Sequence, residues 1–113
     1  MAKADRLERL DMRRAELEAD YRDALIAALR ATAAGRWGLF GHHADRHARA
    51  AAKPALDQLE ELADDIDRLR EQLGLEPFTL HRQFLAARGP VAADAVGEPK
   101  QAKAWLAQMG AAD

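Results

Sequence analysis

Leucine and alanine recur at spacings of three and four residues along most of the chain, which is the pattern of an apolar face on an α-helix. One such run predicts a helix over residues 5–34: Leu7, Leu10, Leu17, Tyr21, Ala24, Ala28 and Ala31. A second run predicts a helix over residues 44–73: Leu59, Leu62, Ile66, Leu69 and Leu73. Gly35 and Gly74 follow these runs and can supply left-handed caps. The heptad-like spacing indicates coiled-coil packing between the two helices.

Proline, threonine and glycine divide the rest of the chain into shorter elements. Pro54 falls inside the second run, so we expect that helix to be kinked or broken there. Thr79 can begin a short helix over residues 79–88, before Gly89 and Pro90. Pro99 suits the first turn of a last helix over residues 99–109.

These elements predict an all-α fold in which the two long helices form an antiparallel hairpin. β-Branched residues are too scarce for strands, and 113 residues suit a single domain spanning residues 1–113. The leucines fit one register, with Leu10 opposite Leu69 and Leu17 opposite Leu62. The same register sets Arg22 opposite Asp57.

Three large apolar residues lie off the predicted hairpin seam, namely Leu25, Ile26 and Leu29. The second helix cannot cover this flank, so another element must. The candidates are the C-terminal helices, through Phe84, Leu85, Trp105, Leu106 and Met109, or a second copy that completes a four-helix-bundle dimer. We expect both to contribute.

Composition excludes several classes of function. The chain has no cysteine and no serine, which removes thiolate metal sites and both common hydrolase nucleophiles, so we lean away from an enzyme. A net charge of -2 argues against a nucleic-acid or membrane partner for the whole surface. No leader or membrane-spanning stretch is evident, so the cytoplasm is the expected location. No motif indicates a cofactor.

The turn between the long helices, residues 35–43, concentrates unusual chemistry. Basic and histidine side chains gather around the start of the second helix and could bind an anion such as phosphate: Arg36, His42, His43, Arg46, His47 and Arg49. The alternative is a solvated basic end that balances the acidic face of that helix. His43 and His47 also have the spacing of a helical metal site, with His81 as a possible third ligand. Solvated histidines are the other explanation.

Aromatic side chains in the same turn suggest either packing or binding. Trp37, Leu39 and Phe40 can plug the alanine-lined end of the hairpin, or together with Trp105 can contact a partner. The last helix can likewise dock onto a partner or, as we favour, onto its own hairpin.

The sequence favours a non-enzymatic protein–protein interaction or self-association module, either as a homodimer or with another protein. The alternative is an anion-binding protein, or a metal-binding one, that uses the basic start of the second helix.

Overall fold

A computed structural model describes residues 2–34, 46–87 and 98–111; at residues 2–3, 46–51, 87 and 98–99 it describes the backbone alone. The described residues form four helices: α1 (Ala2–Ala33), α2 (Arg46–Gln72), α3 (Leu80–Ala87) and α4 (Glu98–Gln108). The predicted all-α fold is confirmed, and each of the four predicted helices is present. The predicted turn at residues 35–43 lies outside the described residues.

Pro54 lies inside α2, which is one helix from Arg46 to Gln72. Of the two outcomes expected at this residue, a kink or a break, the break does not occur. Pro54 is exposed. The N–H that proline lacks is therefore missing on an exposed side of α2, and the helix stays continuous there.

Glycine caps end α2 and α4 in the same way. Gly74 has φ of 69° and Gly110 has φ of 73°, in the left-handed region that favours glycine. After α2, the Leu75 amide donates to the Arg70 carbonyl at 2.8 Å and the Gly74 amide to the Glu71 carbonyl at 3.1 Å. Gly110 and the residue after it make the equivalent pair of bonds at the end of α4. Both ends are Schellman motifs, which satisfy carbonyl groups that the helix itself leaves free.

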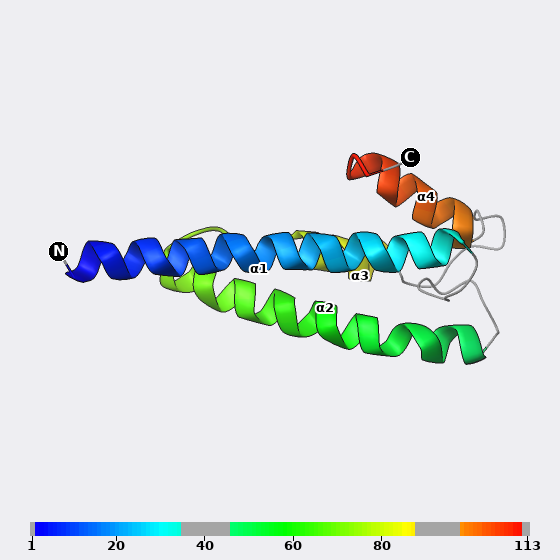
Figure 1. Cartoon of the computed structure of the whole chain (residues 1–113), viewed down its shortest axis with the longest axis horizontal. Helices are drawn as coiled ribbons and strands as arrows, with labels where there is room; N and C mark the ends of the chain where they lie inside the picture. Colours follow the sequence, from blue (N-terminus) through cyan, green and yellow to red (C-terminus); the bar gives the residue numbers. More distant parts are fainter. Residues whose placement is uncertain (1, 35–45, 88–97, 112–113) are drawn as a thin grey trace.

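The helix α1 is the axis of the molecule (Figure 1). The helix α2 runs antiparallel along one side of α1, and α4 packs on another side of its C-terminal half. The short α3 packs against α2, and Figure 1 shows it behind α1. The molecule is elongated, with extents of 57 × 26 × 22 Å. In both views the N-terminal turns of α1 project beyond the end of α2.

The core lies around the C-terminal two thirds of α1. Leu25 and Leu29 are fully buried and Ile26 is 8 % exposed. They share one apolar cluster with Phe84 of α3 and with Ala102 and Leu106 of α4. The prediction that the C-terminal helices cover this flank is confirmed for the residues described. Leu85 is an exception, because it is exposed.

The charge pairing predicted across the hairpin is wrong at Arg22. Its guanidinium donates to the carbonyl of Met109 at 2.6 Å, at the end of α4. Asp57 instead accepts from Lys53, one turn earlier in α2, at 2.9 Å. The cause is α4, which occupies the flank of α1 on which Arg22 lies.

Candidate functional site

The residues predicted to bind an anion or a metal are only partly described. Arg36, His42 and His43 lie outside the described residues, as do the apolar turn residues Trp37, Leu39 and Phe40. Arg46, His47 and Arg49 belong to the first turns of α2, with the backbone alone described. The anion-binding and metal-binding hypotheses therefore stay predictions. Within residues 4–34, 52–86 and 100–111, no three carboxylate or imidazole groups come together to hold a metal ion.

Trp105, the remaining candidate for partner binding, is half-buried in α4. Its ring meets Phe84 of α3 edge to face, with the ring centroids 6.0 Å apart. Ala102 and Leu106, on the same face of α4, are buried in the core. The apolar face of α4 is thus packed within the chain, as we favoured from the sequence.

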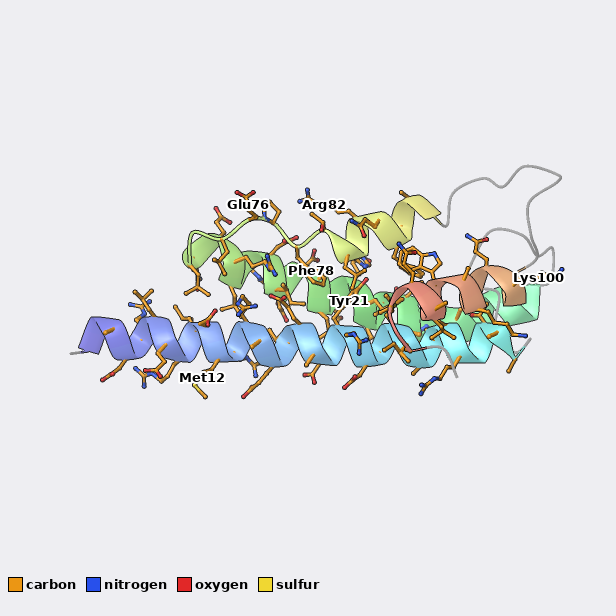
Figure 2. All side chains as sticks on the ribbon, turned by 90° about the horizontal axis from the view of Figure 1, so that it is seen from above. Met12, Tyr21, Glu76, Phe78, Arg82 and Lys100 are labelled. Atoms are coloured by element: carbon orange, nitrogen blue, oxygen red, sulfur yellow. The ribbon has the colours of Figure 1, made fainter. Side chains whose placement is uncertain are left out.

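A buried aromatic cluster joins α1 to α3 and to the connector between α2 and α3, residues 73–79. Tyr21 is fully buried, and its hydroxyl lies 2.8 Å from Nδ1 of His81. The rings of Tyr21 and Phe78 meet edge to face with their centroids 5.0 Å apart (Figure 2). The rings of Tyr21 and His81 meet in the same way at 5.5 Å. Sequence reasoning placed Tyr21 on the seam but missed the cluster. Phe78 gave no periodic signal, because it lies in the connector.

In the Tyr21–His81 pair, the phenol of Tyr21 is uncharged at physiological pH. Burial raises the pKa of the Tyr21 phenol above its ordinary value, so the hydroxyl keeps its proton at physiological pH. His81, 9 % exposed, also borders an open depression of about 290 Å³ between α2 and α3. Lys53, Asp57 and Glu60 line the same depression. The contact between the protonated phenol and this imidazole links α1 to α3 through the core.

A charge cluster fastens α1 to α2 next to these aromatic rings. Glu18 of α1 accepts two hydrogen bonds from Arg70 of α2, at 2.8 and 3.0 Å, and a third from Arg14 at 2.8 Å. Partial burial acts to raise the pKa of Glu18, but the hydrogen bonds and charges of Arg70 and Arg14 outweigh it and lower the pKa. Glu18 therefore holds its charge firmly at neutral pH.

Arg70 extends this charge cluster to the connector. It donates to the carbonyl of Glu76 at 2.9 Å, and its guanidinium lies 5.7 Å from the centre of the Phe78 ring. Asp67 accepts the Phe78 amide at 2.8 Å from the same face of α2. The connector is held both by its backbone and by the ring of Phe78. These contacts position α3, which has only eight residues and no long interface of its own.

The projecting end of α1, residues 4–10, carries apolar surface that the other described helices leave partly uncovered. Leu7 is 43 % exposed, although it continues the seam that buries Leu17 and Tyr21. Leu10 is half-buried, and with Leu7, Arg6 and Gln72 it borders an open depression of about 300 Å³ where α2 ends. Met12 is 59 % exposed and points away from the other helices (Figure 2). The apolar seam of α1 therefore continues to the end of α2 and beyond it.

No family model, curated protein or solved structure matches this chain. None of the described helices combines the length and the apolar character needed to cross a membrane. Any assignment of function rests on the residues themselves.

Proposed function

We propose that this chain is a protein–protein interaction module that receives a helix on the projecting end of α1. The observation that supports this is the continued seam: Leu7 stands in register with the buried residues Leu17 and Tyr21, yet 43 % of it is exposed. Burying that leucine against a partner removes apolar surface from water, which is favourable.

The rest of the described molecule favours a binding role over catalysis. The buried polar groups of the core are engaged in structural bonds, such as the one between Tyr21 and His81. Glu18, the acid with the best-defined environment, is bound by two arginines and is not free to act as an acid or a base. A hairpin with a partly uncovered helix end suits helix-to-helix docking, in which leucines of one helix pack against those of another.

Site-specific photo-crosslinking in the cells that make the chain tests this proposal. A photoreactive phenylalanine analogue replaces Leu7 in one chain and Met12 in another. Met12 is the matched control, because it is more exposed than Leu7 but points away from the seam. We expect a discrete adduct from position 7 and none from position 12. The absence of any adduct at position 7, or equal labelling from both positions, would show that the projecting end does not bind a protein.

A further inference from the structure

The two flanks of the projecting end of α1 carry opposite charge. Side chains three or four residues apart share one face of a helix. Arg6, Arg9 and Arg13 follow that spacing along one side of the seam. Glu8 and Asp11 follow it along the other side. All five of these side chains are exposed, so whatever docks on Leu7 and Leu10 lies between a basic flank and an acidic flank.

The position of α2 restricts how a second copy could dock there. Beyond Leu10 the seam is occupied by α2, whose last residue, Gln72, shares a depression with Leu7 and Leu10. A second α1 running parallel to the first would meet that end of α2 and overlap it. Two copies can therefore use this surface only in the antiparallel orientation, with their projecting ends overlapping.

An antiparallel pair of identical helices sets like flanks against each other. The two-fold axis crosses the interface, so the basic flank of one copy faces the basic flank of the other, and the acidic flanks do the same. Arg6 would lie near Arg9 and Arg13 of the second copy. On the acidic flank Asp11 is already paired with Arg14 at 2.8 Å, so the repulsion between two copies comes mainly from the arginines. Like charges across a helix interface oppose association and select against that partner.

From this arrangement we propose that the projecting end of α1 binds a helix of a different protein. That helix carries a stripe of leucines, and acidic residues border the stripe on the side that faces Arg6, Arg9 and Arg13. This inference rests on the proposed function, because it names the partner of the same surface. The apolar stripe supplies affinity by burying Leu7 and Leu10, and the charged flanks supply the choice of partner.

The mass of the adduct and a charge reversal test this inference together. The photoreactive residue stays at position 7, in the otherwise unchanged chain, in Arg6→Glu and in the control Arg30→Glu. Arg30 is an exposed arginine in the last turn of the same helix, at the end opposite residues 4–10. We expect the unchanged chain to give an adduct with another protein whose crosslinked segment carries acidic residues beside leucines.

Arg6→Glu should lower the yield of that adduct about fivefold, because one exposed attraction becomes a repulsion. Arg30→Glu should leave the yield unchanged. Arg6→Glu should also allow some adduct between two copies, since the introduced glutamate of one copy would then face Arg9 and Arg13 of the other.

The two failures are distinguishable. An adduct between two copies of the unchanged chain would support docking on this surface and overturn our choice of partner. A yield unaffected by Arg6→Glu would overturn the role of the basic flank. If position 7 gave no adduct of any kind, the proposed function itself would fail.

Discussion

Tyr21 connects three parts of the chain through one side chain. Its ring packs against Phe78 of the connector, and its hydroxyl lies 2.8 Å from His81 of α3. A fully buried hydroxyl of this kind must have a partner, because an unbonded polar group in the core costs more than the bond contributes. The short helix α3 is thus positioned by a polar contact as well as by Phe84.

Replacing Tyr21 with phenylalanine should therefore weaken the fold. Tyr21→Phe keeps the ring but removes the hydroxyl from His81, and we expect the free energy of unfolding to fall by about 1 to 2 kcal/mol. Urea denaturation at pH 7 measures this loss. Met12→Leu, a change at an exposed site, should leave the free energy unchanged. An unaltered midpoint for Tyr21→Phe would show that the hydrogen bond contributes nothing net.

The buried phenol also predicts a dependence of stability on alkaline pH. Burial raises the pKa of Tyr21 in the folded chain above the ordinary value of about 10, so the unfolded chain loses this proton first. The stability that the protonated phenol contributes is fully present below about pH 10 and is lost as the pH rises toward the pKa of Tyr21 in the folded chain. Tyr21 is the only tyrosine, so the ultraviolet absorbance of the phenolate reports it alone. A folded chain that titrates at about pH 10 would contradict the prediction.

Glu18 predicts the opposite dependence, at acid pH. Its pKa is lowered in the folded chain by Arg70 and Arg14, against the effect of partial burial. The stability it contributes is present above the unfolded pKa of about 4.3 and is lost as pH falls toward the folded pKa. Glu18→Gln should lower the free energy of unfolding by about 1 kcal/mol at pH 7. It should also flatten the acid limb of the plot of unfolding free energy against pH.

Glu16→Gln is the matched control for Glu18→Gln, because Glu16 is an exposed glutamate of the same helix. Chemical denaturation between pH 3 and 7 compares the two variants. If the acid limb of Glu18→Gln coincided with that of Glu16→Gln, the cluster around Glu18 would have no part in the loss of stability at low pH.

The helices themselves depend on their ends. Gly74 closes α2 with a φ of 69°, and a Cβ placed there would meet no atom within 4 Å. The cost of any side chain at this position is therefore a cost of backbone conformation alone. The cap also turns the chain into the connector that carries Phe78 back to Tyr21.

Gly74→Ala should lower the free energy of unfolding by about 1 kcal/mol, because alanine resists the left-handed conformation. Gly74→Asn should cost less, since asparagine adopts that conformation more readily. Thermal unfolding of both variants measures the difference. Equal losses would mean that the cap is not held in the left-handed region in solution.

Local signals in the sequence were enough to place the helices, because each depends on residues close together in the chain. Spacing at three and four residues located α1 and α2, and Gly74 marked the end of α2. The sequence left a kink and a break at Pro54 both open, because propensity alone does not show that an exposed proline can remain in a long helix. Contacts between distant residues were much harder to predict.

The contacts that were missed depend on where α4 and the connector lie. Arg22 was assigned to Asp57 because only two helices were considered, and α4 redirects it to Met109. Phe78 carries no periodic signal, so its contact with Tyr21 follows only from the path of the connector. The anion and metal hypotheses centre on residues 35–43, which lie outside the described residues, and they stay predictions.

At the scale of the whole molecule, α4 completes what the hairpin lacks. A hairpin of two helices leaves one flank of α1 open, and here Leu25 and Leu29 on that flank are fully buried. The cover consists of α4, with Leu106 in the core, and of Phe84 in α3. Arg22 fixes the far end of α4 by its bond to the Met109 carbonyl. In the elongated molecule α4 thus covers only the C-terminal part of α1.

Detaching α4 should convert the chain into a self-associating one. Leu106→Asp places a carboxylate in the core, where an unpaired charge is strongly unfavourable, so α4 should leave α1 and expose Leu25 and Leu29. An exposed apolar flank of this kind promotes association. We expect higher binding of a hydrophobic dye and a larger sedimentation coefficient that rises with protein concentration. Lys103→Asp, an exposed change in the same helix, should alter neither property. If Leu106→Asp sedimented like the unchanged chain and bound no additional dye, the flank of α1 would be stable without α4, and the core described around Leu25 and Leu29 would not require it.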